Sequence, residues 1–168
     1  MSVLPITKGV DHEILRTVSK PVKKIDKKIK KLIDDMIDTM EDAEGLGIAA
    51  PQVGVNLRIY IARLNFNTDH EMNVPMINAE FLHMSEDMND AEEGCLSIPK
   101  RFGTVRRHTE VTIRYMDVKG KWITLNLKGL NARIMQHETD HLNATLIADK
   151  MIEEADEEPL KVARRKSK

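Results

Sequence analysis

The chain has 168 residues, of which 41% are hydrophobic and 32% are charged, and its formal net charge is −1. This size and balance fit one domain with a single core and argue against a disordered or fibrous chain. The near-zero net charge gives no reason to expect DNA or a membrane surface as a partner. No apolar run approaches the roughly 18 residues of a membrane span, no signal peptide opens the sequence, and the single Cys95 fits a reducing cytoplasm.

Helical periodicity is clearest over residues 25–42, IDKKIKKLIDDMIDTMED. Isoleucine, leucine and methionine recur on one face while lysine and aspartate fill the other, which predicts an amphipathic helix. Glycine and proline then interrupt the pattern over residues 44–54, EGLGIAAPQVG, which predicts a loop. Residues 57–64, LRIYIARL, alternate and are rich in β-branched side chains, so we expect a strand.

The second half of the chain is dominated by β patterns. Short strands are expected between residues 74 and 86, and two further strands over residues 104–127 around a turn. A second, mostly buried helix is expected from Gly129. Residues 151–168 turn first acidic and then basic, which favours an exposed tail or a short helix.

These elements predict an α+β fold in which antiparallel strands pack around a central helix. An amphipathic helix near the N-terminus and a short C-terminal helix complete the prediction. No internal repeat or linker is visible, so residues 1–168 are expected to form one domain.

The stretch MQHETDHL places His137 and His141 four residues apart, with Glu138 directly after the first histidine. Residues four apart share one face of a helix, so the two imidazoles can bind one metal ion. Glu138 lies about 100° round the helix. Its carboxylate can therefore reach a metal-bound water as a general base without ligating the ion. An ordinary polar helix can carry the same letters, so the motif alone leaves both interpretations open.

A catalytic site needs a third protein ligand. The long zincin pattern fails, because Ala144 and Ile147 stand where its glycine and third histidine would be. A glutamate among residues 153–158 is possible, although that charge run looks solvated. Cys95, in AEEGCLSIP, offers a soft thiolate ligand. The alternative is that Cys95 is a small buried hydrophobic residue, as free cysteines often are.

Three stretches taken together are far more specific: GLGIAAPQ (45–52), EGCLS (93–97) and QHETDHL (136–142). They resemble the signature motifs of peptide deformylases, GxGxAAxQ, EGCLS and HExDH, in the same order. The resemblance extends from about Leu4 to Lys150. It implies a bacterial, cytoplasmic, metal-dependent hydrolase that removes the formyl group from the N-terminal formyl-methionine of newly made polypeptides.

The resemblance also implies a role for individual residues. By role, the implied residues are Cys95, His137 and His141 for the metal; Glu138 as the general base; Gln52 and the backbone N–H of Leu96 for the oxyanion; and Gly45, Leu46, Gly47 and Ile48 along the substrate. The implied ion is Fe²⁺ in the cell, with Zn²⁺, Ni²⁺ or Co²⁺ able to substitute. The residues themselves do not choose among these ions, since a set of two histidines and a cysteine suits several.

A methionine side chain needs a hydrophobic pocket, and the candidates to line it are Ile48, Ile134 and the aliphatic part of Arg133. An ion pair between a glutamate at 92 or 93 and an arginine at 106 or 107 could hold the EGCLS loop. Solvated side chains are the equal alternative.

Two other functions stay open. A zinc endopeptidase could use the same HExxH motif on internal peptide bonds, and a non-catalytic homologue could bind a metal without an open position. The expected partners are N-formyl-methionyl peptides and nascent chains. The basic tail, Lys161 and residues 164–168, could contact ribosomal RNA, or could simply aid solubility.

Overall fold

The computed structural model describes residues 2–155. Within this range the helices are η1 (Glu13–Arg16), α1 (Lys27–Asp42), η2 (Ala50–Val53), α2 (Gly129–Leu142) and η3 (Ile147–Asp149), where η marks a 3₁₀ helix. The strands of the same range are β1 (Gly47–Ala49), β2 (Ile59–Leu64), β3 (Met72–Met84), β4 (Met88–Cys95), β5 (Ile98–His108), β6 (Glu110–Met116), β7 (Trp122–Lys128) and β8 (Met151–Ala155). No helix of the described residues is long and apolar enough to span a membrane.

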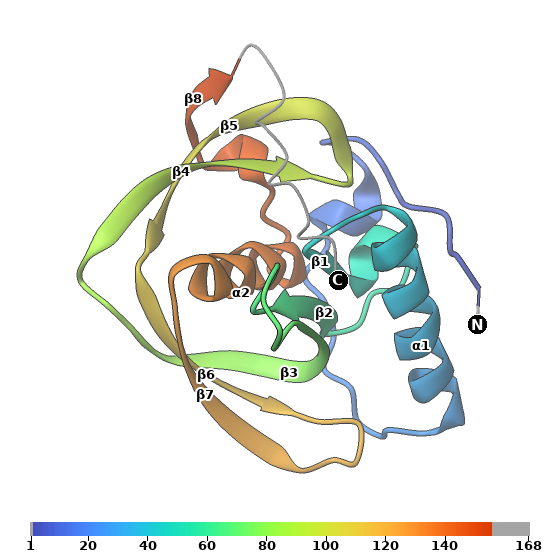
Figure 1. The fold of residues 1–168 in the computed structure, drawn as a ribbon. Helices are drawn as coiled ribbons and strands as arrows, with labels where there is room; N and C mark the ends of the chain where they lie inside the picture. The colour runs from blue at the N-terminus through green and yellow to red at the C-terminus, as the bar shows by residue number, and fades with distance from the viewer. Residues whose placement is uncertain (1, 156–168) are drawn as a thin grey trace.

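The strands form two sheets, which surround α2 (Figure 1). One sheet has five strands in the order β1-β2-β3-β6-β7, and the other has three in the order β4-β5-β8. Every strand pairing within these sheets is antiparallel. The predicted α+β class with antiparallel strands is therefore confirmed. Among the described residues, strand β1 lies at an edge of its sheet, so no strand of this part of the chain pairs with its other side.

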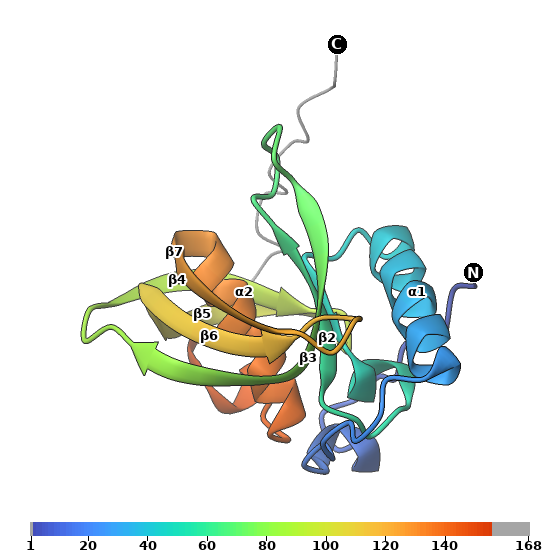
Figure 2. The ribbon, with the colours of Figure 1, turned by 90° about the horizontal axis from the view of Figure 1, so that it is seen from below.

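Strand β2 is buried on both faces because a helix covers each side of it. Ile59 and Ile61 belong to the cluster that packs against α1, whereas Tyr60 and Ala62 belong to the cluster beneath α2. Figure 2 shows α1 and α2 on opposite sides of this part of the sheet. The alternation of side chains along a strand thus separates two hydrophobic cores.

Helix α1 has a clear local cause, whereas α2 is anchored by a contact with a distant strand. Asp26 caps α1, since its carboxylate accepts the backbone N–H groups of Lys28 and Ile29 at 2.9 and 3.0 Å. The helix then buries its methionine and isoleucine stripe. Helix α2 is tied to the end of β5 by Gln136, which accepts the His108 N–H at 3.0 Å and donates to the His108 carbonyl at 2.9 Å.

Two strand expectations are corrected. Residues 72–84 form one long strand rather than two short ones, because shifts in the pairing of β3 with β6 let the strand bend without breaking. The sequence also suggests a loop for the EGCLS segment. Instead, Cys95 ends strand β4 and only a tight turn at residues 96–97 separates it from β5.

The C-terminal expectation is also partly wrong. Residues 151–155 form strand β8, paired with β5, and not a tail or helix. Gly103 of β5 allows this pairing, because a Cβ there would lie 2.7 Å from the carbonyl oxygen of Glu153. The remainder of the expected tail, including Lys161 and residues 164–168, lies outside the described residues.

Candidate functional site

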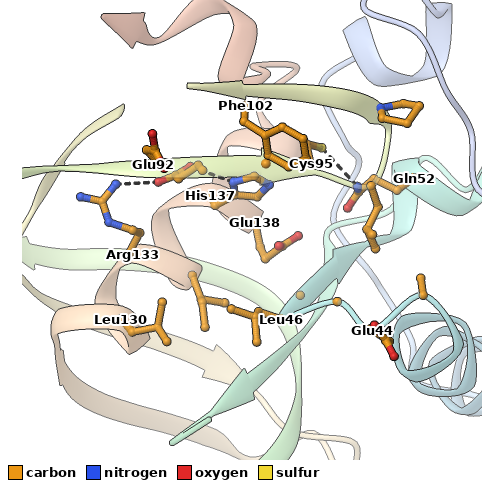
Figure 3. A pocket seen from close by; sticks show the side chains of 18 of the residues that line it. Glu44, Leu46, Gln52, Glu92, Cys95, Phe102, Leu130, Arg133, His137 and Glu138 are labelled. Atoms are coloured by element: carbon orange, nitrogen blue, oxygen red, sulfur yellow. Dashed lines mark hydrogen bonds and ion pairs between the residues drawn. The ribbon is translucent and has the colours of Figure 1, made fainter. Parts of the chain in front are cut away.

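A cavity of about 690 Å³ lies between the β1 edge, the β4–β5 hairpin and α2 (Figure 3). The three motif stretches, far apart in the chain, meet there. Among the residues lining the cavity are Gly45, Leu46, Gly47, Gln52, Cys95, Leu96, Phe102, Leu130, Arg133, Ile134, His137 and Glu138.

The ligand atoms of Cys95, His137 and His141 all lie within 4.8 Å of one another. Cys95 Sγ is 3.3 Å from His141 Nε2, and the two imidazole rings lie 5.1 Å apart between their centres. The end of β4 supplies the thiol, and one face of α2 supplies both imidazoles. The four-residue spacing of the histidines therefore has the consequence expected of a helix.

This donor set fits a divalent cation. Glu93 Oε2 accepts the Nδ1–H of His137 at 2.9 Å, which leaves the Nε2 lone pair of His137 for the shared site. Burial alone would lower the pKa of His137, but contacts with Cys95 and Glu93 raise it well above its usual range. Burial and the charge of His137 lower the pKa of His141. A cysteine and two histidines whose ligand atoms converge in this way form a typical ligand set for a metal ion.

Glu138 lies beside these three residues and is almost fully buried. Its Oε2 has no hydrogen-bond partner within the described residues, and burial raises its pKa to about 7. Gly47 makes room for it: a Cβ on Gly47 would lie 2.6 Å from Cδ and 2.8 Å from Cγ of Glu138. The second glycine of GLGIAAPQ is thus required by the glutamate of the third motif.

Gln52 presents its amide nitrogen to the site. Its side-chain oxygen accepts the Ala49 N–H at 2.9 Å, so the –NH₂ group must be the end that faces Cys95 and Ser97. The amide nitrogen is 3.2 Å from Ser97 Oγ and 3.6 Å from Cys95 Sγ. Leu96 lies between those two residues in the β4–β5 turn and lines the cavity.

The expected ion pair beside the cysteine is present and belongs to Glu93 rather than Glu92. Arg107 donates to both oxygens of Glu93, at 2.8 and 2.9 Å, whereas Arg106 pairs with Asp90. Burial by itself would raise the pKa of Glu93. Hydrogen bonds from Arg107 and His137 outweigh burial and hold the pKa of Glu93 well below its usual range. Glu93 is therefore a buried carboxylate that stays ionised.

The walls of the cavity correct one expectation. Ile134 and the Arg133 stem line it, but the side chain of Ile48 does not. Ile48 is fully buried and packs into the cluster against α1, because strand alternation turns it to the other face of β1.

Leu130 and Phe102 are among the residues of the wall that sequence reasoning overlooked. Leu130 precedes Ile134 by four residues, and this helical spacing could have identified it. Phe102 lies on β5, where its ring packs over Gly94, and no local signal marked it.

Comparison with known proteins points to one family. The family model described as polypeptide deformylase matches residues 3–157. The peptide deformylase of Chlorobium phaeovibrioides is 40% identical over 151 residues, which cover 89% of this chain and 78% of that protein. That of Thermotoga neapolitana is 41% identical over 138 residues, covering 82% of this chain and 81% of the relative.

Solved structures give the same result for the fold. The crystal structure of peptide deformylase from Thermotoga maritima matches with a TM-score of 0.83 and 37% identity, covering 90% of this chain and 99% of that one. A class I type b peptide deformylase from Acinetobacter baumannii with Met-Ala-Ser bound matches with a TM-score of 0.84 and 38% identity, covering 90% and 100%. The chain belongs to the polypeptide deformylase family, whose members are metal-dependent enzymes that remove the N-formyl group from nascent peptides.

Proposed function

We propose that this chain hydrolyses the formyl group from N-formyl-methionyl peptides in the cavity between β1, the β4–β5 hairpin and α2, and releases formate. The observation that carries this proposal is the convergence of the three ligand atoms with Glu138 and the Gln52 amide at one cavity. The Acinetobacter relative that binds Met-Ala-Ser supports a peptide of this kind as the ligand.

Cys95, His137 and His141 would hold one divalent ion, with Fe²⁺ the ion in the cell and Zn²⁺, Ni²⁺ or Co²⁺ able to replace it. When bound, this ion supplies Lewis-acid activation of water and of the formyl oxygen. The protein's contribution is to hold the two imidazoles and the thiolate in one buried group.

Glu138 acts as the proton carrier. Its carboxylate takes a proton from the attacking water and later returns it to the nitrogen of the leaving amine. In the metal-free protein burial raises the pKa of Glu138 to about 7, and a bound cation would lower it again. A carboxylate whose pKa is raised by burial can both accept a proton from water and return it to the amine. Gly47 keeps the space that this carboxylate occupies.

Negative charge develops on the formyl oxygen when water adds to the carbon. The Gln52 amide and the backbone N–H of Leu96 donate hydrogen bonds to this oxygen, and each such donor is worth roughly 3–4 kcal/mol. Because Ala49 holds the other end of the Gln52 side chain, the donor needs little reorganisation during the reaction.

The substrate backbone adds to the open edge of β1 along Gly45–Gly47, a mode that accepts many sequences. The methionine side chain enters the apolar part of the cavity beside Leu130, Ile134 and the Arg133 stem. A formyl group has only hydrogen on its carbonyl carbon, so a tight site at this point accepts it and excludes acetyl.

The wider setting follows from this substrate. Formylated nascent chains place the protein in a bacterial cytoplasm, and residues 1–168 act as one domain. The basic C-terminal residues would contact the ribosome transiently. Removing residues 159–168 should then weaken co-sedimentation with ribosomes, and unchanged co-sedimentation would dismiss the contact.

The experiment that tests the main proposal is formate release from N-formyl-Met-Ala-Ser. Protein purified without oxygen and loaded with Fe²⁺ should release formate, and the Glu138→Ala variant should not. Cleavage of unformylated peptides that survives loss of Cys95 would favour a zinc endopeptidase instead. Tight metal binding without any formate would favour a non-catalytic homologue.

A further inference from the structure

The carboxylate of Glu93 is held on all sides. A carboxylate offers about four lone-pair directions. Arg107 takes one on each oxygen, His137 takes a second on Oε2 at 2.9 Å, and Arg133 Nη1 takes a second on Oε1 at 2.8 Å. Glu93 can therefore neither rotate nor shift without losing a charge-assisted hydrogen bond.

Arg133 connects this carboxylate to the cavity. It lies one helical turn before His137 on α2, and its stem lines the cavity while its guanidinium points towards β4 (Figure 3). Its Nη1 also donates to the Val105 carbonyl at 2.9 Å, and its Nη2 donates to the carbonyl and side-chain oxygens of Asn89 at 3.0 and 2.7 Å. Arg133 thus has a contact with strands β4 and β5 that is separate from its contact with Glu93.

One arginine cannot balance the negative charge of the carboxylates around Glu93. Arg107 serves two carboxylates, because its Nη1 also donates to Asp140 at 2.6 Å. Lys150 pairs with Asp140 as well, but its side chain is 42% exposed. Arg133 is the second well-buried cation at Glu93 in the described part of the chain. Without Arg133, Oε1 of Glu93 would lose a hydrogen-bond partner. Glu93 and Asp140 would then share Arg107 as their only well-buried arginine among the described residues, and this buried cluster would carry excess negative charge.

We propose that Arg133 is a positioning residue for the metal-dependent reaction. It holds Glu93 from the cavity side, Glu93 holds the Nδ1–H of His137, and the Nε2 of His137 is thereby directed at the site shared with Cys95. The inference rests on the proposed function, and it adds one residue that touches neither the ion nor the reacting atoms.

Arg133→Met tests this, since methionine keeps an apolar stem of similar reach and removes the guanidinium. Affinity for Co²⁺, measured by competition with a chelator, should fall by roughly tenfold or more, the effect typical of partners that orient a metal ligand. In the Co²⁺-loaded protein, kcat for N-formyl-Met-Ala-Ser should fall by a similar factor. KM should stay within about twofold, because the wall of the methionine pocket is kept.

Two matched variants separate positioning from simple loosening of the fold. Arg106→Met removes a neighbouring arginine that pairs with Asp90 on the same strand pair, and it should leave Co²⁺ affinity unchanged. Asn89→Ala removes the side-chain anchor of Arg133 and leaves its contact with Glu93. It should lower the unfolding free energy without lowering Co²⁺ affinity. Equal losses of affinity in Asn89→Ala and Arg133→Met would overturn the proposal.

Metal affinity and kcat of Arg133→Met within about twofold of the native values would also overturn it. If Arg133→Met does not fold, Arg133→Lys is tested in its place. Lysine keeps the positive charge but cannot donate to Glu93, Val105 and Asn89 with the planar geometry of a guanidinium, so Co²⁺ affinity should still fall. An unchanged affinity would overturn the proposal. The affinity readout does not depend on turnover. A native protein that releases no formate would therefore count against the proposed function, and not against the role of Arg133.

Discussion

Replacing Gly47 by alanine should place a methyl group where Glu138 now lies. The new Cβ would be 2.6 Å from Glu138 Cδ and 2.8 Å from its Cγ, whereas carbon atoms normally approach to about 3.5–4.0 Å. Gly47 pairs with Ala62 in the β1–β2 ladder, so the backbone resists moving away. Because the φ angle of Gly47 is not positive, alanine adds no conformational strain of its own.

The side chain of Glu138 must therefore shift by about 1 Å. Overpacking of this kind costs about 1–3 kcal/mol of unfolding free energy. A displacement of that size in a catalytic group costs on the order of 100-fold in rate. We expect both effects from Gly47→Ala, with the loss of kcat larger than any change in KM.

Urea unfolding and formate release measure the two effects, and a double-mutant cycle with Glu138→Ala isolates their cause. Glu138→Ala removes both carbons that the methyl would strike. In that background Gly47→Ala should cost less than about 0.5 kcal/mol. If Gly47→Ala destabilised the protein equally with and without the Glu138 side chain, the predicted steric clash would be refuted. A Gly47→Ala enzyme with the native kcat would refute it as well.

Three further predictions concern stability. Ala144 follows α2 in the left-handed backbone region, with a φ of 60°, which costs about 1–2 kcal/mol for a residue with a Cβ. Ala144→Gly should remove this cost and raise the urea midpoint, because the gain exceeds the entropy that glycine adds to the unfolded chain. Asp26→Ala should lower the unfolding free energy by about 1 kcal/mol through loss of the α1 cap, with Asp26→Asn close to native. In metal-free protein, burial raises the pKa of Glu138 from its ordinary 4.5 to about 7. Its ionisation therefore weakens the fold as pH rises through that window. Glu138→Gln should be more stable than native by up to about 3 kcal/mol at pH 8, and the difference should vanish near pH 4; equal stability at both pH values would contradict this.

Much of the fold follows from local pattern. The stripe over residues 25–42 predicts α1 to within two residues, and alternation predicts β2, because side-chain period depends on backbone geometry alone. Strand β8 was missed for the opposite reason. Its acidic residues show no strand pattern, and their pairing needs the close approach of β8 to β5 that Gly103 allows.

The residues of the candidate site also fall into those that local pattern predicts and those that it does not. Helical spacing indicated His137, His141 and Glu138, since a four-residue repeat can be read locally. Local chemistry left Cys95 open between a metal ligand and a buried hydrophobic residue, and only the resemblance of the three motifs to peptide deformylases favoured the ligand. The orientation of Ile48 away from the cavity could not be read, because it depends on which face of β1 meets α1.

The sequence by itself determined which groups the protein can offer: a cysteine sulfur, two imidazoles on one helical face, a neighbouring carboxylate and an amide. The tertiary structure decided that these groups meet, since segments more than 40 residues apart must be brought together by the two sheets around α2. It also decided that Glu93 binds two arginines and a histidine, and that Gly47 faces Glu138. Such contacts depend on packing between distant segments, and no local spacing encodes them.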